Sequence, residues 1–294
     1  MSANRTMKAS VFSSFFSEPA RAIEVYNAAA GTNYAVDTPI EFNTLEDVLF
    51  KNRMNDISFL LDGKLIVLIE HQSMLNDNMA LRMLLYIGRL YEKLLNDNSS
   101  IYREKRIALA APQFIVMYNG AKAIPQRSQQ KLSEAFSIGQ EEAKLELTVD
   151  VFDIGIHEGE PEPGILQESE SLKEYSTFVH EVNYGLQHGK LPFDQAVSRA
   201  IRVCIQRDIM KGFLQEHGAE VENMLYTEWN IDDMCRVARE EGWEDGLEQG
   251  REAGESLFAQ LIRCLITDQR MGDVELVTKD KNARLRLYQE YKLQ

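Results

Sequence analysis

The chain has 294 residues, of which 44% are hydrophobic, and a formal net charge of −14 at pH 7. This length and composition are typical of a globular protein with one or two domains, and no stretch approaches the roughly 18 apolar residues of a membrane-spanning helix. The acidic balance argues against binding to nucleic acid by net charge alone, because affinity for phosphate comes mainly from Lys and Arg. Most of the acid lies in residues 131–294, which carry 18 basic and 33 acidic side chains, whereas residues 61–130 carry 9 and 6.

The cysteines and the N-terminal residues indicate a reducing compartment. Cys204, Cys235 and Cys264 form an odd set without CxxC spacing, so neither a disulfide framework nor a thiolate zinc site is supported. The first residues contain no apolar run with the length of a secretory signal. We therefore expect a cytoplasmic protein with reduced thiols and no membrane partner.

The first half of the chain predicts an α/β arrangement. Apolar side chains one helical turn apart, followed by a glycine, predict a helix at residues 18–31. Strands rich in Ile, Leu, Val and Phe are predicted at residues 40–50, 56–61, 64–70, 111–120 and 144–154, and a second helix at residues 76–98. The predicted order is αβββαβ with one additional helix and strand.

The second half predicts helices only. Residues 157–171 combine Gly and Pro with a cluster of Glu and indicate a domain edge or a long surface loop. Helices are predicted at residues 172–187, 193–215 and 231–266. In the last one, glycine recurs every four residues at Gly242, Gly246, Gly250 and Gly254. On a helix these glycines form a bare stripe flanked by acid, which favours either a marginal, solvated helix or a surface for a homo-oligomer or a protein partner.

Glu70, His71 and Gln72 stand at the end of an apolar strand. Because side chains alternate along a strand, Glu70 and Gln72 share one face, and His71 points to the other face, where we expect it to pack or to support the site. Two oxygen-bearing groups can hold a hard cation only if another carboxylate meets them. Asp56, at the start of the preceding strand, is the candidate.

Whether Asp56 meets Glu70 depends on the register of the hairpin between them. A two-residue turn pairs residue 61 with 64 and puts Asp56 and Glu70 on opposite faces of the sheet. A three-residue loop pairs residue 61 with 65 and sets Asp56 opposite Glu70, on the same face. A shared site therefore requires paired residue numbers that add to 126, or a bulge with the same effect.

Magnesium is the cation that such a site would take, because Mg²⁺ prefers oxygen ligands and retains several waters. The ion would lower the pKa of a bound water and polarise a phosphate. The spacing alone is also typical of solvated acids at strand ends. The residues by themselves leave both interpretations open.

Asp56, thirteen intervening residues and then Glu70-x-Gln72, on a helix and three strands, resemble the PD-(D/E)XK nuclease core. The chain is specifically similar to the recombination-promoting nuclease (Rpn) family, also described as YhgA-like transposases, at residues 45–95, 113–120 and 239–254. The resemblance implies a restriction-endonuclease-like mixed-sheet core (αβββαβ) over residues 10–155, followed by an acidic, all-helical region over residues 168–294.

The resemblance also implies roles for the motif. Asp56 and Glu70 would be ligands of Mg²⁺ or Mn²⁺, and Gln72 would take the place of the usual lysine. An amide cannot act as a cation, so the group that stabilises charge stays open, with Lys64 and Lys51 as guesses.

Such nucleases often add a Glu from the first helix to the catalytic site. Glu24 is the best placed candidate, ahead of Glu18 on the same helix and Glu46 on the first strand. A solvated glutamate on a helix surface is the alternative interpretation of Glu24 and Glu18.

A basic, partly aromatic stripe follows the second predicted helix. Arg82, Tyr86, Arg89 and Lys93 fall at positions i, i+4, i+7 and i+11. In a nuclease of this fold the helix lies beside the active face, so the stripe would contact DNA phosphates. An ordinary solvated helix face has the same pattern.

We therefore predict an enzyme, a divalent-metal-dependent DNA endonuclease that hydrolyses phosphodiester bonds, with Asp56 and Glu70 holding the metal. The family association adds recombination or mobile elements. The alternative is a catalytically degenerate nuclease fold that acts as a module for binding protein or DNA, which the net charge and the missing lysine favour.

Overall fold

A computed structural model describes residues 10–43, 57–95, 101–102, 104–120, 122–137 and 142–293 of the chain, with the backbone alone at residues 227–253 and 255. The chain forms two compact units, residues 1–228 and residues 229–294.

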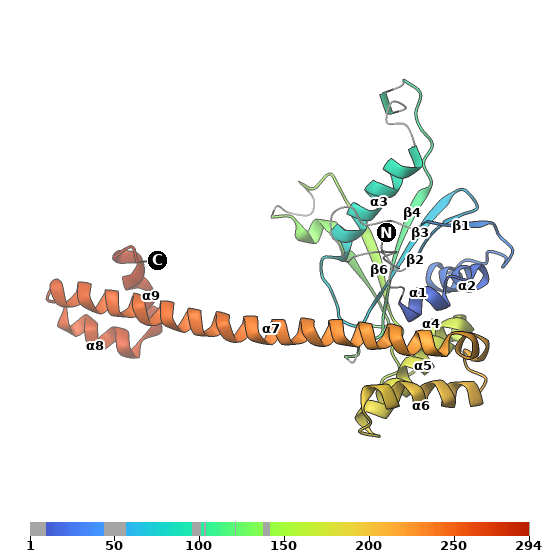
Figure 1. Cartoon of the computed structure of the whole chain (residues 1–294). Coiled ribbons are helices and arrows are strands. Elements are labelled where there is room, and N and C mark those ends of the chain that lie inside the picture. Colours follow the sequence, from blue (N-terminus) through green and yellow to red (C-terminus); the bar gives the residue numbers. More distant parts are fainter. Residues whose placement is uncertain are drawn as a thin grey trace, which may run out of the picture. The chain divides into compact units, whose positions relative to one another are not determined.

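The first unit is built on a six-stranded mixed sheet (Figure 1). Its strands are β1 (Ile40–Phe42), β2 (Ile57–Leu61), β3 (Leu65–Gln72), β4 (Ala111–Tyr118), β5 (Arg127–Lys131) and β6 (Thr148–Asp153). They lie in the order β1-β2-β3-β4-β6-β5. The strands β1, β2 and β3 are antiparallel, β3, β4 and β6 are parallel, and β5 is antiparallel to β6. The predicted α/β class with a mixed sheet and a helical C-terminal region is confirmed.

The hairpin between β2 and β3 has the three-residue loop and not the two-residue turn. Asp62 and Gly63 both have left-handed backbone conformations, with φ of 50° and 63°. The amide of Lys64 donates to the carbonyl of Leu61 at 3.0 Å, and Leu61 pairs with Leu65. Gly, which has no side chain, and Asp, which has a short one, tolerate positive φ, which explains why this dipeptide turns the chain here.

The register that the candidate site requires is present in this hairpin. Leu61 pairs with Leu65 and Ile57 with Ile69, so that paired residue numbers add to 126, as predicted. Asp56, the acid that this register was expected to bring to Glu70, lies outside the described residues. The predicted first strand is described only at Ile40–Phe42.

Helices cover both faces of the sheet (Figure 1). One face carries α1 (Val11–Phe15), α2 (Pro19–Ala30), α4 (Ile165–Glu168), α5 (Glu170–Gln187), α6 (Phe193–Gln206) and the first turns of α7 (Lys211–Thr267). Its core includes Phe12, Phe59, Val67 and Phe178. The other face carries α3 (Met79–Leu95), which packs on Ile66, Leu68 and Val149. Residues up to Leu225 share the first core, within the compact unit of residues 1–228. The predicted division into a core at residues 10–155 and a helical region at residues 168–294 stays a prediction.

Three elements differ from the sequence-based expectation. The residues predicted as one helix at 193–215 belong to two helices, because the chain breaks after Gln206, where Asp208 and Met210 adopt left-handed conformations with φ of 60° and 47°. The edge strand β5 was not predicted, since its sequence RSQQK has no apolar periodicity. The five-residue helix α1 was not predicted either, because it is shorter than a periodic pattern can reveal.

The second unit contains the later part of α7 with α8 (Met271–Lys279) and α9 (Lys281–Glu290). Its small core consists of Leu261, Leu265, Val277 and Leu287. The backbone is helical across the predicted glycine stripe. The use of this stripe as a partner surface stays a prediction. In the parts of the chain that the structure describes, no helix is both long and apolar enough to cross a membrane.

His71 is partly buried on the face of the sheet opposite to Glu70, as predicted. Its ring stacks on Phe12 with a centroid distance of 4.8 Å, and the Tyr175 hydroxyl lies 3.3 Å from its Nε2 atom. Burial lowers the pKa of His71 from 6.5 to about 4, although a hydrogen bond with Asn119 raises it in part. His71 is therefore neutral in the folded protein at neutral pH.

The neutral His71 should make the protein sensitive to acid. Between the unfolded pKa of 6.5 and the folded pKa of about 4, the unfolded state binds a proton that the folded state does not. The free energy of unfolding should therefore fall as pH drops through this window, by about 3 kcal/mol from this residue. Denaturant unfolding at pH 7 and pH 4.5 should show a smaller loss in His71→Phe than in wild type. His217→Gln, at a partly exposed histidine, is the control and should lose as much free energy of unfolding as wild type. An equal loss in His71→Phe would refute the assignment to His71.

Candidate active site

Glu70 and Gln72 lie at the carboxyl end of β3, on the face covered by α3. Their neighbours on the same face of the strand, Ile66 and Leu68, belong to the core beneath α3. Both polar side chains are nearly inaccessible to solvent, with exposed fractions of 3% for Glu70 and 8% for Gln72. The predicted sharing of one face by these two residues is confirmed. A buried carboxylate needs a partner of opposite charge, because desolvation penalises its ionised form.

The partner of Glu70 is an arginine from α3. Arg82 Nη2 donates to Glu70 Oε2 at 3.1 Å and to the Tyr86 hydroxyl at 3.0 Å. The pair is largely buried, since the Arg82 side chain is only 19% exposed. Arg82 and Tyr86, predicted as members of a DNA-contacting stripe, thus point to the end of β3.

Gln72 is held at the same place by the start of α3. Its Nε2 atom donates to the thioether of Met79 at 2.8 Å, and Arg82 Nη1 donates to the same sulfur at 3.3 Å. The buried Oε1 atom of Gln72 has no hydrogen-bond partner among the residues that the structure describes. A buried carbonyl oxygen beside a carboxylate suits a hard cation or a bound water, so this donor set fits Mg²⁺ or Mn²⁺.

Tyr86 completes the cluster from one turn further along α3. Burial raises the pKa of Tyr86 above its ordinary value, and the negative charge of Glu70 raises it further. The phenol is therefore neutral across the physiological range and serves as a hydrogen-bonding group. The cluster of Glu70, Gln72, Arg82 and Tyr86 combines one anion, one cation and two neutral polar groups.

The rest of the predicted stripe continues along α3. Arg89 is half-buried and Lys93 is exposed. Contact of the stripe with DNA stays a prediction. The pairing of Arg82 with Glu70 was not predicted, although the helix joins two adjacent parallel strands and must therefore pack across their surface. The spacing of Arg82 and Tyr86 was visible in the sequence, but nothing local showed which side of the helix meets the sheet.

Glu24 lies on α2, which packs on the face of the sheet opposite to Glu70. Its carboxylate accepts hydrogen bonds from Ser169 Oγ at 2.8 Å, Ser171 Oγ at 2.7 Å and the Ser171 amide at 3.0 Å. These groups form the N-terminus of α5. Glu18 pairs with Arg21 on the surface of α2. A catalytic role for Glu24 stays a prediction, and its contacts are those of a residue that joins two helices.

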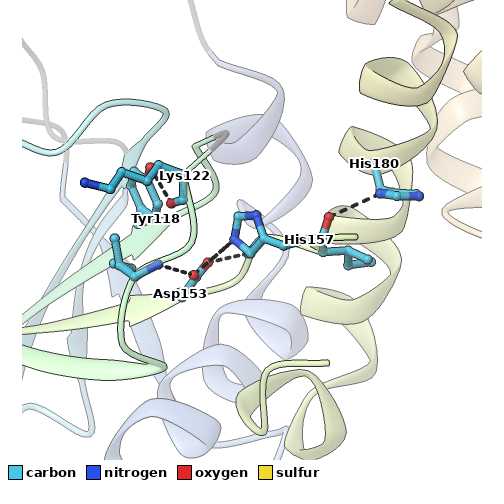
Figure 2. Close-up of polar contacts among 8 residues, drawn as sticks. Tyr118, Lys122, Asp153, His157 and His180 are labelled. Atoms are coloured by element: carbon cyan, nitrogen blue, oxygen red, sulfur yellow. Dashed lines mark hydrogen bonds and ion pairs between the residues drawn. The ribbon is translucent and has the colours of Figure 1, made fainter. Parts of the chain in front are cut away.

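A second polar cluster lies at the carboxyl ends of β4 and β6 (Figure 2). Asp153 is 2% exposed and accepts from the amides of Ile124 at 3.1 Å and Gly155 at 2.8 Å. His157 Nε2 lies 3.1 Å from its Oδ2 atom and 3.3 Å from Oδ1. The sequence did not single out this aspartate, because one of its two backbone donors, the Ile124 amide, is 29 residues away. The hydrogen bond from the Ile124 amide ties the chain after β4 to the end of β6.

Only one of the two predicted metal ligands, Glu70, lies within the described residues. No three His, Cys, Asp or Glu side chains within the described ranges lie together in a way that could hold a metal ion. Asp56, Glu46 and Lys51 lie outside those ranges. The predicted ligand pair of Asp56 and Glu70 therefore stays a prediction, and only Glu70 is among the described residues.

Comparison with known proteins identifies one family. Residues 42–160 match the model of a family described as "Putative transposase, YhgA-like". The match confirms the family resemblance predicted from the sequence, over less than half of the chain, and it includes Glu70, Gln72, Arg82 and Tyr86. No curated protein and no solved structure matches the chain.

Proposed function

We propose, from the membership of residues 42–160 in the YhgA-like transposase family, that the protein is a divalent-metal-dependent DNA endonuclease that serves a mobile element or DNA recombination. The observation that carries the proposal is the hairpin register. In this register, an extension of β2 by one residue would set position 56 opposite the buried carboxylate of Glu70 without a bulge.

The arrangement of the sheet supports a restriction-endonuclease-like fold. The elements α2, β1, β2, β3, α3 and β4 follow the order αβββαβ. The first three strands are antiparallel, and α3 connects β3 to the parallel strand β4. This fold places its catalytic acids on the second and third strands, which are β2 and β3 in this chain.

The side chains suit hydrolysis of a phosphodiester. Glu70 and Gln72 offer oxygens to Mg²⁺ or Mn²⁺, with Asp56 as the second carboxylate. When bound, the cation supplies an activated water and neutralises charge on the phosphate. Glu70 and Gln72 are buried, which keeps their oxygens in a low-dielectric setting where electrostatic interactions are strong.

Nicking of supercoiled plasmid tests the proposal. Wild-type protein with Mg²⁺ or Mn²⁺ should convert the plasmid to relaxed circles, and chelation should stop the reaction. Glu70→Gln and Asp56→Asn should each slow nicking by about a hundredfold or more. Glu70→Gln is preferable to alanine, because its amide oxygen can still accept from Arg82 and the variant should stay folded. Glu41→Gln, at an exposed acid on β1, is the matched control.

The outcomes separate the proposal from its alternative. Absence of nicking by wild type with every divalent cation would reject the enzyme and favour a degenerate fold that binds protein or DNA. Nicking that survives both substitutions would mean that the reaction site lies elsewhere. Thermal unfolding of each variant confirms that lost activity is not lost folding.

A further inference from the structure

We propose that Arg82 is a catalytic residue that supplies the positive charge at the reacting phosphate. Before a metal cation binds, Arg82 pairs with the Glu70 carboxylate, and the cation then replaces Arg82 as the partner of Glu70. This inference rests on the proposed nuclease function and deepens it. Gln72, at the position where a lysine is usual in such nucleases, carries no charge. Arg82 is the cation that the fold brings to the same point.

The position of Arg82 is set by the packing of α3. Met79 and Met83, three residues before and one residue after it, are fully buried against the sheet. These anchors direct the guanidinium to the end of β3, where it contacts Glu70, Met79 and Tyr86. The Tyr86 ring lies 5.8 Å from the guanidinium carbon. A charge held in this way loses little entropy when it meets a substrate.

The chemistry calls for such a charge. In hydrolysis the water oxygen forms a bond to phosphorus while the bond to the leaving oxygen breaks, and negative charge grows on the non-bridging oxygens. A guanidinium offers several N–H donors in one plane and matches the geometry of a phosphate. Arg82 transfers no proton in this scheme, since the attacking water gives its proton to solvent and the leaving oxygen takes one from another water. Gln72 can donate a hydrogen bond but cannot neutralise charge.

The contact with Glu70 makes the cation and Arg82 competitors. Both are positive, and a cation held by Glu70 would share the carboxylate whose Oε2 atom Arg82 contacts at 3.1 Å. A cation at Glu70 would weaken this pair and free the guanidinium for the phosphate, with the Tyr86 hydroxyl still bound to Nη2. Removal of the Arg82 charge should therefore slow cleavage and strengthen cation binding. A purely structural arginine would weaken both.

Three variants test whether loss of the Arg82 charge slows cleavage while it strengthens cation binding. Arg82→Met keeps an apolar stem without charge, Arg82→Lys keeps the charge, and Arg202→Met removes an exposed arginine of α6 as a control. The kcat and KM for plasmid nicking in Mn²⁺ are measured, together with the Mn²⁺ dissociation constant in the absence of DNA by calorimetry. In Arg82→Met, kcat should fall about a hundredfold or more with KM little changed, while Mn²⁺ binds several-fold more tightly. Arg82→Lys should recover at least a tenth of the wild-type kcat, and Arg202→Met should match wild type.

Each outcome decides the matter. A wild-type kcat in Arg82→Met, or weaker Mn²⁺ binding together with no recovery in Arg82→Lys, would overturn the catalytic role of Arg82. Wild-type protein that nicks no plasmid would reject the nuclease function itself, which is a different result from loss of kcat in Arg82→Met alone. Thermal unfolding shows which variants are folded under the assay conditions.

Discussion

Replacement of Glu24 by alanine should lower the free energy of unfolding by about 2–4 kcal/mol. The Glu24 carboxylate accepts three hydrogen bonds from Ser169 and Ser171. Ser169 in turn accepts from the amide of Leu172 and caps α5, and both serines are buried. Loss of the carboxylate leaves buried donors without an acceptor and removes a negative charge from the N-terminus of a helix, where it is favourable.

Denaturant unfolding of two matched variants checks this expectation. Glu18→Ala removes the other candidate acid of α2, whose pair with Arg21 is exposed, so it should change the free energy of unfolding by well under about 1 kcal/mol. A double-mutant cycle of Glu24→Ala with Ser171→Ala should show coupling above about 0.5 kcal/mol. Equal, small effects of Glu24→Ala and Glu18→Ala would show that the α2–α5 connection carries no stability. Nicking by folded Glu24→Ala then tests the separate prediction that Glu24 takes part in catalysis.

Replacement of Asp153 by asparagine should destabilise the protein by a similar amount, about 2–4 kcal/mol. Asp153 Oδ1 accepts from the Gly155 amide and Oδ2 from the Ile124 amide, so both oxygens face backbone donors. Asparagine has one oxygen and one NH₂ group. Whichever way the amide is turned, its NH₂ group faces a buried backbone N–H donor. The substitution also removes the negative charge of the carboxylate that His157 contacts.

The location of this effect can be measured as well as its size. Amide hydrogen exchange at Ile124 and Gly155 should become much faster in Asp153→Asn than in wild type. Asp150→Asn, on the same strand, is the control, because Asp150 is partly exposed and pairs with Arg127 of the edge strand β5, so it should contribute little. Unchanged exchange at both amides would show that Asp153 does not hold the chain after β4.

The hairpin and the faces of β3 follow from local rules. Asp62-Gly63 is a turn signal because few other residues tolerate two successive positive φ values, and the alternation of a strand puts Glu70 and Gln72 together on any sheet. The helix α3 was predicted because its apolar spacing extends over more than four turns. The choice between a two-residue and a three-residue loop stayed open in the sequence. Only the pairing of Leu61 with Leu65 decided it.

The partners of the polar side chains depend on contacts between distant segments. Periodicity showed that Arg82 and Tyr86 share one side of a helix, but the rotation of that helix against the sheet is set by Met79, Met83 and the side chains they meet. Glu24 looked like any acid on a helix surface, and its partners are 145 and more residues away.

Most of the strands and helices, apart from α1 and β5, and the face of β3 that carries Glu70 could be predicted from the sequence, because these properties depend on the period of the backbone and on neighbours within one or two turns. Three features became visible only in the folded chain: the contact of Arg82 with Glu70, the contact of Glu24 with the start of α5, and the break between α6 and α7. These features depend on how whole elements pack, and packing follows from shape and burial summed over many residues rather than from any one local pattern.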